Sequence, residues 1–317
     1  MKSYSFSSIF TEAFRDNLGW EKVWTKRQPK KEYQIIIVGG GGHGLATAYY
    51  LAKNYNITDI AVIEKGWIGG GNTGRNTTII RSNYLQESSI GIYEKSRFLY
   101  ETLSQDLNYN IMFSPRGVLM LCQTEHELRA MKRTSHANRI NGVDTKMVAP
   151  EEVKEIVPII NINGPRFPVL GALWQPRGGT ARHDAVSWGY ARKCSDYGID
   201  IIEQCEVIGV KKKREKIVGL ETNKGVLKAG KVCFVAAGHS SVLADLAGFR
   251  LPIESVALQA LVSEPIKPII DCVVMANTVH GYLSQSDKGE LVIGGGADGY
   301  NNSVSYTHLT LPTNREV

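Results

Sequence analysis

The sequence contains no long hydrophobic run, although 43% of its 317 residues are apolar. No stretch approaches the roughly 20 consecutive apolar residues that a membrane-spanning helix needs. The first 33 residues also have neither the apolar run nor the small-residue cleavage site of a secretory signal. We therefore expect no membrane span, no membrane partner and a cytoplasmic location.

The chain has few cysteines and only a small excess of positive charge. The five cysteines are scattered and never form a C-x-x-C pair: Cys122, Cys194, Cys205, Cys233 and Cys272. Such a set fits neither a disulfide framework nor a zinc site, so we expect a reducing compartment and no metal. Of the formal net charge of +6, half comes from the first 33 residues, which hold seven Lys or Arg and four Asp or Glu. The remaining chain is only mildly basic, and we expect no nucleic-acid partner.

Residues 1–33 form an extension ahead of the first motif. The stretch FSSIFTEAFRDNLGWEKVW has the pattern of a short amphipathic helix, and a basic tether with one proline follows it. This extension is either a solvated tail or a strap that lies on this or another subunit. We favour the strap, because leaving Phe10, Phe14, Trp20 and Trp24 in water is unfavourable.

A dinucleotide-binding pattern follows in YQIIIVGGGGHGLATAYYLAKNYNITDIAVIEKG. A β-branched strand leads into Gly39, Gly41 and Gly44, which fit G-x-G-x-x-G, and an apolar helix comes next. A second strand over residues 60–63 is followed by Glu64, about 20 residues beyond the last glycine. A carboxylate at this place accepts a hydrogen bond from a ribose hydroxyl. The glycines permit the tight turn, the approach of backbone to a pyrophosphate, and close packing of helix on strand. An acid at this place disfavours a 2′-phosphate but leaves both FAD and NAD open.

The next segment favours FAD over NAD. GGGNTGRNTTIIRSNY, residues 69–84, is rich in Gly, Asn, Thr and Arg, where an NAD domain would continue into another apolar helix. A polar glycine loop can wrap a longer ligand and donate hydrogen bonds to its diphosphate and flavin edge. The alternative is a plain surface loop, which three asparagines and two arginines in sixteen residues disfavour.

A later helix opens on three titratable residues. In QPRGGTARHDAVSWGYAR, Arg182, His183 and Asp184 stand side by side where the helix begins. The residues alone predict a capping cluster, with Thr180 as N-cap and Asp184 interacting with the helix dipole. A helix start is also a good place to hold an anion or to activate an imidazole.

Together these stretches resemble the D-amino-acid-oxidase-like family of FAD-dependent oxidoreductases and, within it, the beta subunits of heterotetrameric sarcosine oxidases. The resemblance covers about residues 5 to 303 and is carried by GWEKVW, IIIVGGGGHGLATAYYLAK, GGGNTGRNTTIIRSNY, GGTARHDAVSWGYAR, VCFVAAGHSS and GELVIGGGADGYNN. It implies non-covalent FAD at Gly39, Gly41, Gly44 and Glu64. Further cofactor contacts are implied at Gly42, His43, Lys65, Asn72, Thr73, Arg75, Asn76, Val207, Ala237 and Gly238.

Two more roles come from the resemblance. The histidine of GGTARHDAV carries a covalent FMN in those subunits, joined through the 8α-methyl carbon of the flavin, and that position is His183. A neutral imidazole is a competent nucleophile, and Arg182 would stabilise negative charge on the flavin. Arg81, with Tyr84 just beyond it, matches an arginine that pairs with the carboxylate of a small N-methyl amino acid; a guanidinium suits that task because it offers two parallel donors. The alternative for Arg81 is a surface ion pair.

The implied activity is oxidative demethylation of sarcosine, with electrons passing from FAD to FMN and then to oxygen. The one-carbon unit would leave as formaldehyde or pass to tetrahydrofolate, and the partners would be alpha, gamma and delta subunits. Two alternatives stay open: a single-flavin amine or amino-acid dehydrogenase in which His183 only caps its helix, and a non-catalytic FAD-binding subunit.

The expected fold is α/β, with a Rossmann-like FAD domain and an α+β substrate domain on a mostly antiparallel sheet. The FAD domain would use residues 34–110 and 179–250, and the substrate domain 111–178 and 251–303. Helices are predicted at about 90–107 and 125–141 and a strand at 117–123. The end of the chain, residues 304–317, departs from the family and is expected to be a non-native tail that replaces roughly the last 100 residues of a longer protein.

Overall fold

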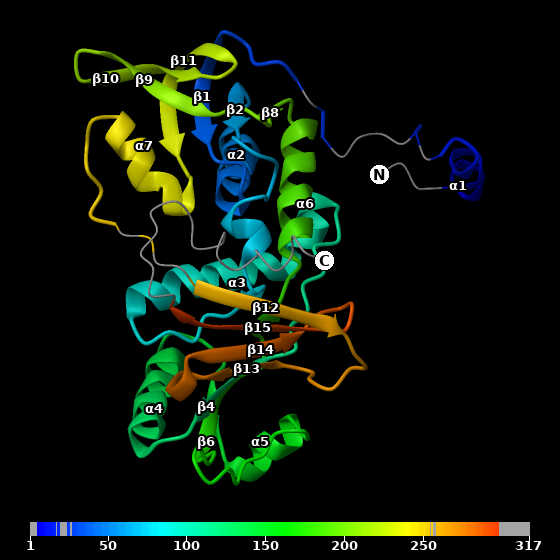
Figure 1. Ribbon diagram of the computed structural model, residues 1–317, viewed down its shortest axis with the longest axis vertical. Helices are drawn as coiled ribbons and strands as arrows, with labels where there is room; N and C mark the ends of the chain where they lie inside the picture. Colours follow the sequence, from blue (N-terminus) through cyan, green and yellow to red (C-terminus); the bar gives the residue numbers. More distant parts are fainter. Residues whose placement is uncertain are drawn as a thin grey trace.

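The computed structural model describes residues 5–16, 18–19, 24–25, 27–253, 255 and 258–297. It contains two large sheets, one above the other in Figure 1, with helices packed on each. The predicted Trp20 of the strap and the predicted tail 304–317 lie outside the described residues.

The first sheet has six strands in the order β8-β2-β1-β11-β10-β9. Its first four strands are parallel, and the last three form an antiparallel meander. The strands are β1 (Glu32–Val38), β2 (Ile60–Ile63), β8 (Asp200–Ile202), β9 (Val207–Lys213), β10 (Lys216–Thr222) and β11 (Gly225–Phe234). The first two predicted strands therefore form, and they are apolar throughout their inner part because helices and loops cover both faces of the sheet.

Three helices cover one face of this sheet: α2 (Gly42–Tyr55), α3 (Glu87–Leu107) and α6 (His183–Asp196). Helix α2 directly follows β1, so the glycine motif becomes the turn between strand and helix. Leu45, Tyr49 and Tyr190 are buried in the core that joins these helices to the sheet. The short α7 (Ser240–Leu246) packs near the opposite face, where Leu243 joins a second core.

The second sheet has seven strands in the order β12-β15-β14-β13-β4-β6-β5. All its neighbours are antiparallel except β13 and β4, which run parallel. The strands are β4 (Val118–Cys122), β5 (Lys146–Val148), β6 (Gly171–Gln175), β12 (Leu258–Pro265), β13 (Val273–Ala276), β14 (Gly281–Gln285) and β15 (Glu290–Ala297). Its helices are α4 (Glu125–Ile140), which begins with a capping box between Thr124 and Glu127, and α5 (Pro150–Ile156). The mostly antiparallel second sheet confirms the predicted fold class; the residue boundaries of the two domains stay a prediction.

A two-stranded ladder joins segments that lie far apart in the sequence. Strand β3 (Ile79–Ile80) pairs antiparallel with β7 (Gly179–Thr180). Because Thr180 is extended in this ladder, it does not cap the next helix, and the prediction of Thr180 as N-cap is wrong. Helix α6 begins at His183, and Arg182 is its N-cap residue.

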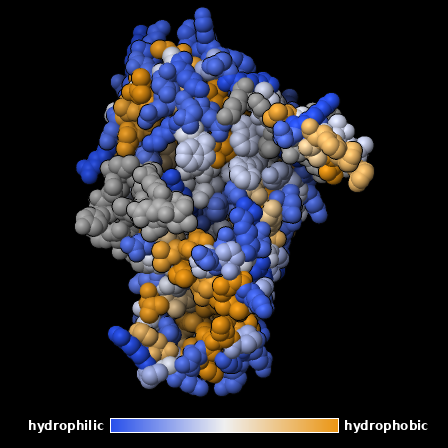
Figure 2. Space-filling model, turned by 45° about the vertical axis from the view of Figure 1, so that its right-hand side comes forward, coloured by the Kyte–Doolittle hydropathy of each residue, from blue (hydrophilic) through white to orange (hydrophobic). Residues whose placement is uncertain are grey.

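The N-terminal extension contains helix α1 (Phe6–Ala13), which stands apart from the body in Figure 1. Its apolar side chains are exposed, as are those of Phe14 and Leu18, and Figure 2 shows this apolar group projecting from the molecule. The tether, in contrast, contacts the body of the molecule. Trp24 packs against the core that α2 and α6 share with the first sheet, and Arg27 forms a 3.0 Å ion pair with the buried Asp200. In the described part of the chain, none of the helices has both the length and the apolar character to cross a bilayer.

Candidate flavin and substrate sites

The glycine motif forms a tight cradle at the carboxyl end of β1. Gly39 has φ +122°, and a Cβ there would lie 2.2 Å from the carbonyl oxygen of Val235, which follows β11. A Cβ on Gly44 would lie 2.0 Å from the carbonyl oxygen of Gly39. Side chains at these two positions would push α2 and β11 away from β1. The N-terminus of α2 thus opens at the edge of the parallel strands, where dinucleotides bind in such sheets.

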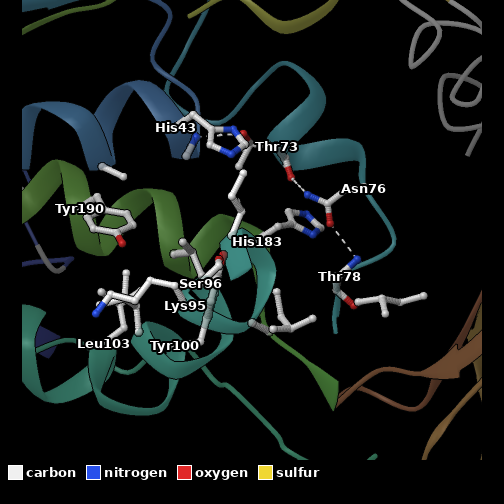
Figure 3. Close-up of a pocket in the computed structure, with 18 of the residues that line it drawn as sticks. His43, Thr73, Asn76, Thr78, Lys95, Ser96, Tyr100, Leu103, His183 and Tyr190 are labelled. Carbon is white, nitrogen blue, oxygen red and sulfur yellow. Dashed lines mark hydrogen bonds between the residues drawn. The ribbon is translucent and has the colours of Figure 1, made fainter. Parts of the chain in front are cut away.

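The polar loop after β2 folds back onto this helix start. Thr73 lies in a 3₁₀ turn (Asn72–Arg75), and its hydroxyl accepts a 2.9 Å hydrogen bond from the backbone N–H of Gly42. The Thr73 hydroxyl would be 2.9 Å from a Cβ on Gly41. Asn76 then donates to the Thr73 carbonyl and accepts from the N–H of Thr78, both at 2.7 Å (Figure 3). The predicted loop is therefore an ordered wall of the site.

Glu64 ends β2 beside the cradle. Its two carboxylate oxygens accept 2.8 Å hydrogen bonds from the backbone N–H groups of Gly40 and Gly66. Each carboxylate oxygen keeps a further acceptor position. Cys205 donates its N–H to the Glu64 carbonyl at 2.8 Å, which brings the start of β9, with Val207, to the same end of the sheet.

The remaining predicted cofactor contacts surround this edge. Lys65 follows Glu64 and is exposed. Ala237, with φ +48°, and Gly238 lie in the turn after β11, next to Val235. Predicted residues from β1, β2, β9 and β11 therefore gather at one end of the first sheet.

A pocket of about 440 Å³ contains His183. Figure 3 shows His43, Thr73 and Asn76 on one side of it, and Lys95, Ser96, Tyr100 and Leu103 of α3 on the other. The His183 Nδ1 atom is buried and has no hydrogen-bond partner among the described residues. Burial is the main cause that lowers the pKa of His183, with the neighbouring Asp184 acting in the opposite direction. The imidazole is therefore neutral near pH 7, with a nitrogen available to a ligand.

Arg182 and Asp184 neutralise each other at the start of α6. The Nε and Nη2 atoms of Arg182 donate to the two Asp184 oxygens at 3.0 and 2.7 Å. Asp184 also accepts from the N–H of Ala185 at 2.8 Å, so it lies in the first turn as predicted. Burial raises the pKa of Asp184, but its bonds to Arg182 and Ala185 outweigh this and lower it. Because Arg182 is paired, its charge is compensated before any ligand binds.

Arg81 and Tyr84 lie in a different pocket, of about 620 Å³. The Arg81 guanidinium stands 4.1 Å above the Tyr84 ring, and its Nη1 donates to Asn83 Oδ1 at 2.8 Å. Tyr84 in turn stacks on Tyr93, with 4.2 Å between ring centroids. Burial lowers the pKa of Arg81 from its usual value, although it stays a cation. Arg81 forms no ion pair with any described residue. The alternative interpretation of Arg81, as a member of a surface ion pair, therefore finds no partner among those residues.

The segment that contains β3 lines both pockets. Thr77 and Thr78, before β3, line the His183 pocket, and Arg81, directly after β3, lines the other. One continuous segment therefore serves both sites.

Sequence reasoning missed the residues that helix α3 contributes to the His183 pocket. Ile92, Ser96, Leu99 and Leu103 line it at helical spacing. The same spacing is visible in the sequence, but it equally predicts a face packed in the core. Tyr50 of α2 and Tyr190 of α6 complete this wall.

The sequence matches the family of FAD dependent oxidoreductases (DAO) over residues 34–316. The chain belongs to this family. It is 66% identical over 302 residues to sarcosine oxidase subunit beta of Rhodobacter capsulatus, across 95% of this chain and 73% of that protein. It is 51% identical to sarcosine oxidase subunit beta of Rhizobium meliloti, across 96% of this chain and 74% of that protein. The predicted resemblance is thus confirmed.

Solved structures agree. L-Proline dehydrogenase from P. horikoshii superposes with a TM-score of 0.80 at 30% identity, over 91% of this chain and 79% of that one. Glycine oxidase from Geobacillus kaustophilus gives a TM-score of 0.76 at 21% identity, over 85% and 72% of the two chains, and shows the same fold. The flavoenzyme family explains the cradle: the α2 N-terminus suits the diphosphate of FAD, and the open acceptor positions of Glu64 suit its ribose.

Proposed function

We propose that this chain oxidises sarcosine, or a similar small N-methyl amino acid, with FAD held in the glycine cradle. FAD supplies the acceptor for the two electrons. The substrate loses a hydride equivalent from its N-methyl carbon and a proton from its nitrogen, which gives an imine. Water then splits the imine into glycine and formaldehyde unless the one-carbon unit passes to tetrahydrofolate. Its 66% identity to a sarcosine oxidase subunit beta supports the choice of substrate.

The observation that carries the site is the environment of Arg81. This guanidinium is partly buried beside a 620 Å³ pocket, and among the described residues it contacts a neutral amide and an aromatic ring. A buried cation without a carboxylate is unfavourable. The carboxylate of an amino-acid substrate would supply the missing charge through two parallel hydrogen bonds, and Tyr84 would keep the guanidinium plane in place.

We further propose that His183 carries a covalent FMN, to which electrons pass from FAD on their way to oxygen. Three features support this: a pocket of about 440 Å³, a buried Nδ1 that has no partner in the part of the chain that the structure describes, and a pKa held low by burial. The residues fit the group, because a neutral imidazole in the lining of a cavity is the kind of nucleophile that attachment to the flavin methyl carbon needs.

Acid precipitation tests the covalent flavin. The chain is expressed with its partner subunits, denatured in acid and washed. Wild type should give a yellow, fluorescent pellet and His183→Asn a colourless one, whereas His43→Asn, which changes a histidine of the same pocket, should stay yellow. A colourless wild-type pellet, or a yellow one from His183→Asn, refutes the assignment.

One observation favours a second candidate, a single-flavin amino-acid dehydrogenase. L-Proline dehydrogenase from P. horikoshii shares the fold at a TM-score of 0.80 and 30% identity. Anaerobic addition of sarcosine, dimethylglycine and L-proline to the assembled protein separates the candidates, because only a substrate bleaches the bound flavin. Bleaching by L-proline but not sarcosine overturns our choice, and no bleaching by any of the three points to a non-catalytic FAD-binding subunit.

We also propose that the chain works in a complex with alpha, gamma and delta subunits in the cytoplasm. The relatives named subunit beta and the exposed apolar side chains of α1 support such partners. Figure 2 shows further apolar side chains over the lower half of the molecule, and β12 also carries two exposed apolar residues, Leu261 and Val262.

A further inference from the structure

Arg97, in the middle of α3, is only 1% exposed and carries one of the two most deeply buried charges among the described residues, the other being that of Asp200. A buried guanidinium is tolerated only when its donors are paired. Arg97 meets this demand with two carboxylates of its own helix. It grips Glu94 with Nε, at 2.9 Å, and Nη2, and its Nη1 donates to Glu101 at 2.7 Å.

The pairing continues beyond α3 at one end. Arg177, after β6, donates from Nη2 to both oxygens of Glu101, at 2.7 and 2.8 Å. Positive and negative groups thus alternate in the order Arg177, Glu101, Arg97, Glu94. Burial raises the pKa of both carboxyls, but their hydrogen bonds to the arginines outweigh it and lower the pKa of each. Both glutamates are therefore ionised near pH 7, and the four charges cancel.

At its other end the network reaches the segment that carries Arg81. The Ser82 hydroxyl donates to Glu94 at 2.5 Å and accepts from the Gln175 amide at 2.6 Å. The Ser82 N–H donates to the same Gln175 side chain at 3.2 Å. Ser82 and Gln175 are fully buried. Ser82 is thus fixed at both its hydroxyl and its backbone, one residue after Arg81.

Nothing in this network contacts the substrate pocket directly. None of Arg97, Glu94, Glu101 and Arg177 lines the 620 Å³ pocket, whereas Arg81, Asn83 and Tyr84 do. The carboxylate of Glu94 and the amide of Gln175 hold Ser82, and Asn83, the next residue, accepts the 2.8 Å hydrogen bond of the Arg81 guanidinium. The orientation of Arg81 therefore depends on where Ser82 is held.

We infer that Arg97 is a positioning residue for Arg81: through Glu94 and Ser82 it sets the direction in which the substrate-binding guanidinium points. This inference rests on the proposed role of Arg81. It explains why a fully buried arginine, rather than an apolar residue, occupies the centre of α3, since an apolar side chain at 97 would leave Glu94 without the fork that holds it against Ser82.

A double-mutant cycle on the assembled, FAD-containing complex tests this inference. The probe is methoxyacetate, a carboxylate with the size of sarcosine, and its Kd is read from the change that it causes in the flavin spectrum. Arg97→Lys keeps the charge but loses the two-pronged grip. Because small misplacements of a binding group are costly, we expect its Kd to rise on the order of tenfold. In the Arg81→Gln background, Arg97→Lys should cause no further rise.

The matched control is Arg27→Lys, which alters another arginine paired with a buried carboxylate, Asp200, away from both pockets. Its Kd should equal that of wild type. FAD content and Tm are recorded for every variant, and Glu94→Gln replaces Arg97→Lys in the cycle if the latter does not retain FAD.

An unchanged Kd in Arg97→Lys, or an equal rise with and without Arg81, overturns the positioning role. If Arg81→Gln alone leaves the Kd unchanged, the proposed substrate site itself is wrong, and the two failures are thereby distinguished.

Discussion

The neutral state of His183 has a consequence for pH. Burial lowers the pKa of the folded imidazole, whereas in the unfolded chain the pKa is near its usual value of about 6.5. Below that pH the unfolded chain takes up a proton that the folded chain resists, so the stability contributed by the neutral form is present above it and is lost as pH falls. In flavin-free protein, His183→Asn should therefore lose less stability than wild type between pH 7 and 5. Urea unfolding at each pH measures this, and parallel losses in both proteins would contradict it.

The proposed role of Arg81 depends on both its charge and its shape. Arg81→Gln should weaken substrate binding by about 2–4 kcal/mol, because a charge-assisted pair is lost in a desolvated site. Flavin content should change little, since Arg81 lies in a separate pocket from the cradle. Arg81→Lys keeps the charge without the two parallel donors, so its affinity for the substrate should lie between those of wild type and Arg81→Gln. Equal affinity of Arg81→Gln and wild type for sarcosine would rule out the assignment.

At this scale a local sequence pattern marks some residues of the candidate site and misses others. Gly39, Gly44 and Glu64 follow from a local pattern, because strand, turn and helix are consecutive in the chain. The contact between Ser82 and Gln175 joins residues that no local pattern connects. Thr180 was mispredicted as a cap because its backbone pairs with Ile79, and tertiary pairing overrode its local preference.

Among the elements, the contact of α2 with β1 leaves no room for a side chain at Gly44. In Gly44→Ala the new Cβ would overlap the Gly39 carbonyl oxygen, so the helix must shift. We expect a loss of about 1–3 kcal/mol in stability together with weaker FAD retention. Thermal unfolding and flavin content after desalting measure the two effects.

Gly91 provides the matched control within α3. A Cβ there meets no atom within 4 Å, and its backbone is helical. Gly91→Ala should raise stability by about 0.5–1 kcal/mol and leave FAD retention unchanged. If the two alanine variants behaved alike, crowding at Gly44 would not be the cause.

Long elements were predictable and short ones were not. The helix predicted at 90–107 is α3, which begins three residues earlier, and the predicted strand at 117–123 is β4. Helix α3 repeats an apolar period over its length, and β4 is a continuous apolar run. Strands β3 and β7 have two residues each and exist only because they pair with one another, so their own sequences carry no period to detect.

For the molecule as a whole, the N-terminal extension divides into a free part and an anchored part. A chain that begins at residue 20 should unfold at the same temperature as the full chain, because the side chains of α1 are exposed. A chain that begins at residue 31 should lose about 1–3 kcal/mol, since Asp200 then loses Arg27 and Lys30. Thermal unfolding of the isolated chains decides this. A fall in Tm for the shorter deletion would mean that α1 folds onto the body.

The β3·β7 ladder also bears on the order in which the two pockets form during folding. Its two strands are about a hundred residues apart in the sequence, so the ladder is a long-range contact, and we expect it to form late in folding. Before the ladder forms, the backbone segments that lead to His183 and to Arg81 do not have their final conformation. Newly made chains should therefore acquire the capacity to take up a flavin at His183 and to recognise a carboxylate in a single kinetic event.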